Sequence, residues 1–340
     1  MLGLVAVAVV MLVAVLPAKA ITERADRSDS LYLKLATQSS FAPVGQFSFS
    51  TSSGNYLASG SLIGNNWVLT AAHVVDQATA LNFSINGHSY NASRWIANPG
   101  WDPNNLLNGY DLGLVQLSSA VTGITPATLY TGTSEIGSTA TIVGYGRTGT
   151  GKTGAVKYDG KKRAGQNVID TLYAGSGADA RLLLTDFDNP KNIRDSSMGS
   201  SKPLDLEGMI APGDSGGGLF ISSGGQYQLA GVTSFCWGLL DGKPNSDYGD
   251  VGGFSRVSAF TSWINDIIVA APTSSFGQAD MGTLALQDTA VTPEPATLAL
   301  LAVGLGGMLF RRRDSGKSRM RRSAAQAFPL SVLQGTRTGG

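Results

Sequence analysis

The chain of 340 residues contains a single cysteine, Cys236, and only two histidines. One cysteine excludes an internal disulfide, so the stability of the fold has to come from core packing. Charged residues make up 14% of the sequence and the formal net charge is +1, so the chain lacks the strong field that attracts nucleic acid or another polyanion. We therefore predict no nucleic-acid partner. Because the chain has only two histidines, there are few candidates for a catalytic base.

Glycine is abundant, at 44 residues, and from Phe41 onward short alternating stretches of apolar and polar residues lie between Gly, Asn and Pro turns. Short strands at this spacing are typical of β-barrels or a β-sandwich. One helix is expected at Ser258–Ala270, where apolar residues follow a helical stripe and Ser258 can cap the first turn. The expected strands cover residues 45–50, 60–63, 67–70, 81–85, 88–95, 111–117, 138–143, 167–173, 181–185, 217–222, 226–234 and 253–257.

The N-terminal end has the composition of a targeting signal. Residues Leu2–Leu16 are almost wholly apolar, and Ala18-Lys19-Ala20 is a small-x-small cleavage sequence. This pattern predicts a signal peptide over residues 1–20, and therefore export. A membrane anchor is the alternative, which the short apolar span disfavours.

The C-terminal end changes composition twice. Residues 271–290 are linker-like, and 291–313 combine Pro-Glu-Pro, an apolar run and three arginines. The apolar run, Ala296–Phe310, is shorter than the roughly 20 residues of an independent spanning helix, so we expect a transmembrane helix that inserts only transiently. The arginines behind it should stay on the cytoplasmic side. The tail, 314–340, is basic and expected to be disordered.

The stretch Ala211–Gly218, with the sequence A-P-G-D-S-G-G-G, places Ser215 in the middle of a glycine-rich turn. Glycines on both sides let a substrate carbonyl approach the main chain, so the N–H groups of Gly213 and Ser215 could form an oxyanion hole. The hydroxyl becomes a useful nucleophile only with a base beside it. A plain turn between strands is the alternative, so the partners elsewhere in the chain decide between them.

The candidate base and its partner are His73 and Asp111. His73 closes an apolar strand in T-A-A-H and is either the base or a buried core histidine, whereas His88 lies in a polar turn and is expected at the surface. Asp111 opens the apolar stretch D-L-G-L-V-Q-L. A buried carboxylate needs a partner, and the ring N–H of His73 would supply one. Asp102, before a proline, is better interpreted as an exposed turn acid.

The order His73, Asp111, Ser215, with the motifs T-A-A-H, Y-D-L-G-L-V-Q-L and G-D-S-G-G, resembles that of the chymotrypsin (trypsin-like) serine protease family. The resemblance covers about residues 41–270. It implies an all-β fold of two six-stranded antiparallel β-barrels with a C-terminal α-helix, and an active site in the cleft between the barrels. It also implies that Ser215 is the nucleophile, that His73 is the general base and then acid, and that Asp111 orients His73.

The resemblance further implies a role for the acid before the nucleophile, Asp214. In this family that acid binds the N-terminal ammonium of the mature chain. Cleavage after Ala20 would make Ile21 the new N-terminus, an aliphatic residue of the kind that the family inserts there. We expect the charged segment Glu23–Asp29 to loop over the surface so that Ile21 reaches Asp214. The alternative is a free N-terminus, with Asp214 held by another donor.

The same resemblance places four residues in the substrate-binding region. Met209 takes the position at the base of the primary specificity pocket, and Cys236 stands in its wall where a glycine is usual. Ser234 lies on the strand that binds the substrate backbone, and Gly252 is the fourth residue predicted to bind substrate. A thioether cannot pair with Lys or Arg, so we predict a preference for small to medium uncharged side chains before the cut. Three acids could reach the pocket and reverse this preference: Glu207, Asp247 and Asp250.

The segment 291–313 is similar to the PEP-CTERM sorting signal of Gram-negative bacteria, which exosortases recognise. This similarity implies cleavage near Pro293–Pro295 and a location in the periplasm, at the cell surface or outside the cell. Signal peptidase and exosortase would be the processing partners. A simple linker followed by a basic tail is the alternative.

We therefore predict an exported serine endopeptidase with three parts: a signal peptide, a protease region over 21–270 and a sorting segment. A catalytically silent surface binding module with the same fold is the alternative, and an enzyme restricted to esters or one peptide bond is a third possibility. We expect a monomer without cofactor or metal. The acidic loop Asp241–Asp250 could hold Ca²⁺, but a hydrated turn is favoured, and Lys161–Arg163 is expected to be a solvated loop.

Overall fold

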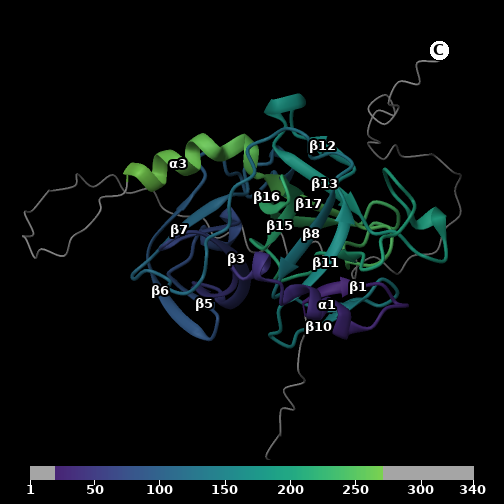
Figure 1. Ribbon diagram of the computed structural model, residues 1–340, viewed down its shortest axis with the longest axis horizontal. Coiled ribbons are helices and arrows are strands. Elements are labelled where there is room, and N and C mark those ends of the chain that lie inside the picture. Colours follow the sequence, from purple (N-terminus) through teal and green to yellow (C-terminus); the bar gives the residue numbers. More distant parts are fainter. Residues whose placement is uncertain (1–19, 271–340) are drawn as a thin grey trace, which may run out of the picture. The chain divides into compact units, whose positions relative to one another are not determined.

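The computed structural model describes residues 20–270 (Figure 1). The predicted signal peptide up to residue 19, the linker, the sorting segment and the tail lie outside these residues. Between residues 20 and 270, no helix is long and apolar enough to cross a membrane. The predicted transmembrane segment, Ala296–Phe310, lies outside the described residues.

The first half of the fold is a closed barrel in which six antiparallel strands follow the order β2-β3-β4-β7-β6-β5. Alternating apolar residues point inward, and Phe47 of β2 faces Phe83 of β5 with ring centroids 4.8 Å apart. A β-carbon on Gly60 would lie 2.6 Å from the Phe47 ring, so glycine at this position lets the ring fill the barrel. The strands are β2 (Val44–Thr51), β3 (Gly54–Gly64), β4 (Trp67–Thr70), β5 (Ala80–Ile85), β6 (His88–Ala97) and β7 (Gly113–Leu117).

The second half is an antiparallel sheet of seven strands in the order β11-β8-β15-β16-β17-β13-β12. Its edge strands β11 and β12 are one stretch of chain bent at Ile169 and Asp170. The N–H of Ile169 donates to Ser138 beside β8, and the N–H of Asp170 donates to Leu184 of β13, so the bend joins the two edges. Its strands are β8 (Thr139–Gly144), β11 (Arg163–Val168), β12 (Thr171–Tyr173), β13 (Leu182–Asp186), β15 (Gly218–Ser223), β16 (Gln226–Trp237) and β17 (Val251–Arg256).

Counting β11 and β12 as one bent strand reduces the seven strands of this sheet to six, the number that the sequence predicts. The predicted fold class is confirmed, since the described residues form mostly antiparallel strands, with a closed barrel, a second sheet and a C-terminal helix. Short helical turns connect the strands at α2 (Ala72–Val75), η1 (Ser39–Phe41), η2 (Leu106–Asn108), η3 (Gly177–Asp179) and η4 (Ile193–Asp195).

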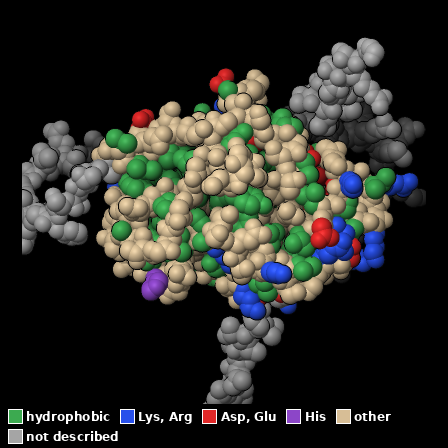
Figure 2. All heavy atoms as spheres, viewed as in Figure 1, with side chains coloured by type: hydrophobic (Ala, Val, Ile, Leu, Met, Phe, Trp, Pro, Cys, Tyr) green, Lys and Arg blue, Asp and Glu red, His purple; other side chains and the backbone are tan. Residues whose placement is uncertain are grey.

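The N-terminal strand β1 (Ile21–Glu23) is an inner strand of a third, four-stranded sheet with the order β10-β9-β1-β14. It runs parallel to β9 (Thr148–Thr150) and antiparallel to β14 (Gly208–Met209), and β10 (Gly154–Lys157) completes the sheet. The helix α1 (Asp29–Ala36), which the sequence did not predict, follows β1. On the face drawn in Figure 2, charged side chains are few and gather mainly toward the end where Figure 1 labels β1, α1 and β10.

The prediction that residues 23–29 loop over the surface is wrong at Glu23 and Arg24, which are buried, whereas Ala25, Asp26 and Ser28 are exposed. Arg163, the first residue of β11, is fully buried and donates to the carboxylates of Glu23, Asp29 and Asp159. The predicted solvated loop over 161–163 is therefore also wrong at Arg163. A buried guanidinium needs carboxylate partners, and two of the three come from the N-terminal segment.

The helix α3 (Thr261–Ala270) begins three residues later than predicted, after the 3-10 turn η5 (Val257–Phe260). Ser258 does not cap it, because its hydroxyl donates to Glu135, which also pairs with the buried Arg256. Ile264 and the turn pack into a cluster that contains residues of both halves of the fold, including Leu69 of β4 and Val232 of β16. Each such buried apolar side chain contributes about 1.5–3 kcal/mol, so this cluster fixes one half against the other.

Candidate active site

His73 and Asp111 meet at the end of the first barrel. The strand β4 ends at Thr70, and the single turn α2 that follows carries His73. Nδ1 of His73 lies 2.7 Å from Oδ2 of Asp111, and the main-chain N–H of His73 donates to Oδ1 at 2.9 Å. One residue therefore engages both oxygens of a fully buried carboxylate. A hydroxyl that sequence reasoning did not link to Asp111 completes the arrangement, since Ser234 of β16 donates to Oδ2 at 2.6 Å.

These contacts shift the pKa values of both groups in opposite directions. Burial raises the pKa of Asp111, but the charge of His73 and the hydrogen bonds from His73 and Ser234 outweigh it, so the net pKa is lowered. Burial lowers the pKa of His73, but the charge and hydrogen bond of Asp111 outweigh this effect and raise it. About a third of the His73 side chain, 32%, is exposed. Because Nδ1 is occupied, Nε2 is the ring nitrogen that a substrate can reach.

The loop that carries Ser215 lies against the strand that leads to His73. A β-carbon on Gly216 would lie 2.0 Å from the hydroxyl of Thr70 and 3.0 Å from the main-chain nitrogen of Ala71. Glycine is therefore required directly after Ser215 if the loop is to approach β4 this closely. The predicted nucleophile and the predicted base thus come from neighbouring segments, although the sequence separates them widely.

The peptide groups around Ser215 have fixed orientations. The carbonyl of Pro212 accepts from the N–H of Arg147 at 2.7 Å, and the carbonyl of Asp214 accepts from the N–H of Gly217 at 2.7 Å. In a trans peptide the N–H points opposite to the C=O, so the N–H groups of Gly213 and Ser215 are turned the other way. Between residues 20 and 270, neither of these two N–H groups donates to a protein group. Two free donors beside one hydroxyl have the layout of an oxyanion hole.

Asp214 and Ile21 also meet. The main-chain nitrogen of Ile21 donates to Oδ2 of the fully buried Asp214, which further accepts from Gly146 at 2.7 Å and Ala211 at 2.9 Å. Burial raises the pKa of Asp214 to about 7, against the opposing effect of these hydrogen bonds and of Arg163. The carboxylate therefore lies in a site that would favour a positively charged partner.

The comparisons with known proteins agree with this geometry. The family model for trypsin matches residues 36–264, which is more than half of the chain. The chain belongs to the trypsin family. A second model, for the PEP-CTERM protein-sorting motif, matches residues 291–313.

Relatives of this trypsin-family chain include chymotrypsin-like elastase family member 1 from several mammals. The Bos taurus protein is 29% identical over 249 residues, which are 65% of this chain and 82% of that protein. The Homo sapiens protein is 27% identical over 240 residues, which are 62% and 81%. The solved structure of HL collagenase has a TM-score of 0.50 at 21% identity, and covers 68% of this chain and 95% of that one, which shows the fold alone.

The structure brings the predicted specificity residues together. Cys236 of β16 and Gly252 of β17 are partners in the strand register, and a β-carbon on Gly252 would lie 3.2 Å from the sulfur of Met209. Met209 has no exposed surface. Burial raises the pKa of the Cys236 thiol, which lies 3.5 Å from Oδ2 of Asp250. The thioether of Met209 and the thiol of Cys236 thus lie on either side of Gly252, where the sequence predicts the specificity pocket.

The three acids that could have reached this pocket behave differently. Glu207 is turned toward another loop, where it accepts from the N–H groups of Asp188 and Leu204. Asp247 accepts from the side chain of Asn245. Only Asp250 contacts a predicted specificity residue, and its carboxylate is also bound by the N–H of Ser246 at 2.7 Å.

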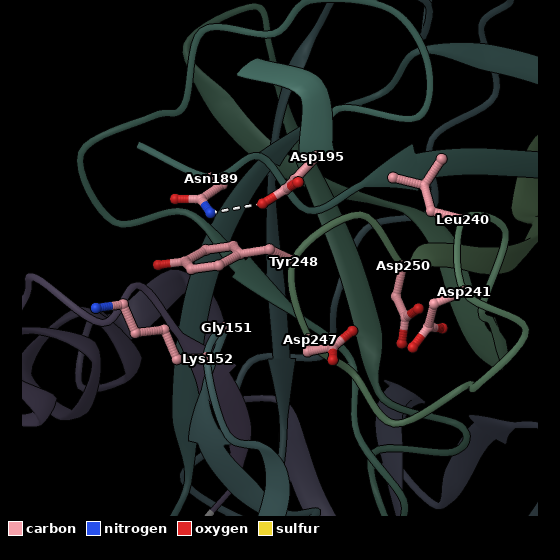
Figure 3. Close-up of a pocket in the computed structure, with 9 residues that line it drawn as sticks. All are labelled: Gly151, Lys152, Asn189, Asp195, Leu240, Asp241, Asp247, Tyr248 and Asp250. Carbon is pink, nitrogen blue, oxygen red and sulfur yellow. Dashed lines mark hydrogen bonds between the residues drawn. The ribbon is translucent and has the colours of Figure 1, made fainter. Parts of the chain in front are cut away.

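Behind Asp250 lies a cavity of about 350 Å³ (Figure 3). In Figure 3, Asp241, Asp247 and Asp250 come from the loop that the sequence singled out as a possible Ca²⁺ site, as does Tyr248, while Lys152 comes from another segment. Burial raises the pKa of Asp250 to about 6. In the part of the chain that the structure describes, no three His, Cys, Asp or Glu side chains are grouped to hold a metal ion.

Proposed function

We propose that this protein is an exported serine endopeptidase that hydrolyses peptide bonds through an acyl-enzyme, with Ser215 as nucleophile. The trypsin family supports a peptidase function. The observation that carries the proposal is the pair His73–Asp111, in which one histidine engages both carboxylate oxygens beside a loop with two free N–H donors. Nothing in a binding module requires a buried acid to be paired in this way.

The proposed reaction uses each group in turn. Nε2 of His73 removes the proton from Ser215 as its oxygen attacks the substrate carbonyl, and the buried charge of Asp111 stabilises the imidazolium. The N–H groups of Gly213 and Ser215 donate to the oxygen that becomes negative. His73 then protonates the leaving amine as the C–N bond breaks, which leaves an ester on Ser215. A water molecule, deprotonated by His73, hydrolyses this ester and restores the enzyme.

We further propose that removal of the leader activates the enzyme. Cleavage after Ala20 would convert the main-chain nitrogen of Ile21, already beside Asp214, into an ammonium that pairs with the buried carboxylate. In the uncut chain Ile21 has a φ of +59°, a strained conformation for a β-branched residue. Hydrolysis of the Ala20–Ile21 bond removes the group that defines this φ, so cleavage relieves the strain.

The substrates proposed are peptides with a small to medium uncharged side chain before the cut. Met209 closes the pocket base without a charge, and Cys236 narrows the wall at its register partner Gly252. The relatives named elastases are consistent with this choice. Ser234 would bind the substrate backbone while its hydroxyl holds Asp111.

We propose the following processing. The sorting-motif match supports export and a surface or secreted location in a Gram-negative host. Signal peptidase would cut after residue 20, and an exosortase would cut near Pro293–Pro295. The catalytic region is proposed to span 21–270, followed by a linker over 271–290, the sorting segment 291–313 and the tail 314–340.

A fluorophosphonate probe tests the central claim, because it reacts only with an activated serine. The wild-type protein should be labelled at Ser215, as located by mass spectrometry of the peptides, and should hydrolyse a trialanine anilide. Ser215→Ala and His73→Ala should lose labelling and lower hydrolysis by several orders of magnitude while keeping the fold. EDTA should leave the chemical step intact. A folded wild-type protein that is not labelled would favour the binding module.

A further inference from the structure

Ser59 is a buried residue of β3 whose N–H and hydroxyl contact the loop that carries Ser215. Its N–H donates to the carbonyl of Ser215 at 2.8 Å, and its hydroxyl donates to the carbonyl of Gly213 at 3.1 Å. These are the two residues whose N–H groups form the proposed oxyanion hole. Ser59 therefore binds the main chain of both of them from the opposite barrel.

Two further contacts fix Ser59 itself. Its hydroxyl accepts from the N–H of Tyr145 at 2.9 Å, next to Gly146, which binds Asp214. Its carbonyl accepts from the hydroxyl of Thr70 at 2.8 Å, at the end of the strand that leads to His73. The hydroxyl thus has a donor and an acceptor in fixed positions, and it cannot turn away without losing one of them.

The peptide group that Ser59 holds is the one between the two proposed donors. The carbonyl of Gly213 and the N–H of Asp214 belong to it, and that N–H donates to Ala211 at 2.9 Å. Gly213 has a φ of +97°, and a glycine backbone rotates more freely than that of other residues because it has no side chain to restrain it. A rotation of this peptide group would change the direction of both neighbouring N–H groups. The hydroxyl of Ser59 is the side-chain contact that opposes such a rotation.

We propose that the Ser59 hydroxyl is a positioning group for the oxyanion hole, which it acts on through the carbonyl of Gly213. This assignment rests on the proposed serine peptidase function. It makes residue 59 a determinant of the rate of the chemical step and leaves substrate binding to other residues. Interactions that act only on developing charge change kcat, and leave KM nearly constant.

The chain offers a matched control two residues further along the same strand. Ser61 is also fully buried, and its hydroxyl has no hydrogen-bond partner. Ser59→Ala and Ser61→Ala therefore remove the same atom from the same strand at the same depth. Only the first removes contacts with the nucleophile loop.

The experiment measures kcat and KM for a trialanine anilide, the binding of a trialanine aldehyde whose adduct carries an oxyanion, and Tm. Ser59→Ala should lower kcat about tenfold or more, change KM less than about twofold, and weaken aldehyde binding by a similar factor to kcat. Ser61→Ala should match the wild type, and Ser59→Thr, which keeps the hydroxyl, should recover most of the rate. The acid limb of the pH profile, set by His73, should not move.

A Ser59→Ala enzyme with wild-type kcat would overturn the assignment. The assignment would also fail if Ser59→Ala lowered Tm but changed kcat no more than Ser61→Ala does. The Ser59 hydroxyl would then be merely structural. A wild-type protein that neither hydrolyses the anilide nor reacts with a fluorophosphonate would overturn the proposed function, and the role of Ser59 with it.

Discussion

The main-chain nitrogen of Ile21 lies 3.3 Å from Oδ2 of Asp214, although the two residues are 193 positions apart in the chain. The contact is completed by Thr148, whose hydroxyl donates to the carbonyl of Ile21. Strand pairing on both sides of β1 holds Ile21 in place. The proposed cleavage after Ala20 would in this way act on Gly213 and Ser215, the residues that flank Asp214.

The first prediction concerns the new N-terminus. One alanine inserted before Ile21, so that the mature chain is one residue longer, should lower kcat by about a hundredfold, as the loss of an oxyanion-hole donor does. The reason is that the ammonium would no longer reach Asp214. Ile21→Val, which keeps the ammonium in place, is the control. Equal turnover in the extended and the natural enzyme would show that Ile21 has no activating role.

The second prediction is the alkaline limit of activity. A free α-amino group has a pKa of about 7.7–8.0, and the carboxylate of Asp214 should raise this pKa in the folded enzyme. A raised folded-state pKa gives stabilisation that is complete below the unfolded value and lost as the pH rises through the folded one. Activity and Tm should therefore fall together in alkali. The extended variant should lack this limb in a profile of kcat against pH.

The third prediction concerns the acid limb. His73 acts as a base only when neutral, and Asp111 raises its pKa above the ordinary value of about 6.5, so activity should rise with pH through a midpoint above that value. Asp111→Asn should move the limb to lower pH and reduce kcat by about 10⁴-fold. Asp102→Asn, in the turn that follows Trp101, is the control and should leave the profile of kcat/KM unchanged. If the acid limb stayed at the same pH in Asp111→Asn, Asp111 would not be the group that raises the pKa of His73.

The fourth prediction concerns substrate choice. Cys236→Gly should widen the pocket beside Gly252 and shift the preferred side chain before the cut from small to large and aromatic. Cys236→Ser, which preserves the size of the side chain, should keep the wild-type preference. A peptide library with all residues at this position measures both profiles. A wild-type profile dominated by Lys or Arg would contradict the assignment of Met209 to the pocket base.

The fifth prediction concerns stability. Arg163 is fully buried among three carboxylates, and Arg163→Gln should lower the free energy of unfolding by about 3–5 kcal/mol, because it leaves charges buried without a partner. Arg27, which pairs with Asp205 at the surface, provides the comparison, and Arg27→Gln should cost less than about 1 kcal/mol. Urea unfolding of both variants measures the difference. Equal losses in the free energy of unfolding would mean that the buried cluster around Arg163 stabilises the fold no more than the surface pair does.

The parts of this protein that the sequence predicts are those with local patterns. The alternation of apolar residues predicts the strands, and the short motifs around His73, Asp111 and Ser215 identify residues that the structure brings into one region. Each motif contains its own structural reason, such as the glycine after Ser215 that lets the loop approach Thr70. The glycines are visible in the sequence, although the contact with Thr70 that requires one of them is not.

The parts that the sequence does not predict depend on partners far away in the chain. Charges in residues 23–29 are typical of a surface loop, and the burial of Glu23 is explained only by Arg163, which lies in another charged stretch. Nothing in the neighbourhood of Ser59 distinguishes it from Ser61, since both belong to an alternating strand. The bend between β11 and β12 is likewise hidden, because the hydrogen bonds made by Ile169 and Asp170 there join it to segments elsewhere in the chain.

The inner position of β1 sets an order on biosynthesis. A ribosome releases the chain from its N-terminus, so Ile21 is among the first residues of the enzyme to emerge. The hydroxyl that binds its carbonyl is 127 residues downstream, and the partner of Thr22 in β14 is 187 residues downstream. One side of the first strand can therefore pair only after β9 has been made, and the other only after β14, when most of the enzyme is complete. A nascent or prematurely terminated chain that ends before Met209 lacks both the complete β14 and Ser215, so the proposed proteolytic activity would begin only once the sheet around β1 can close.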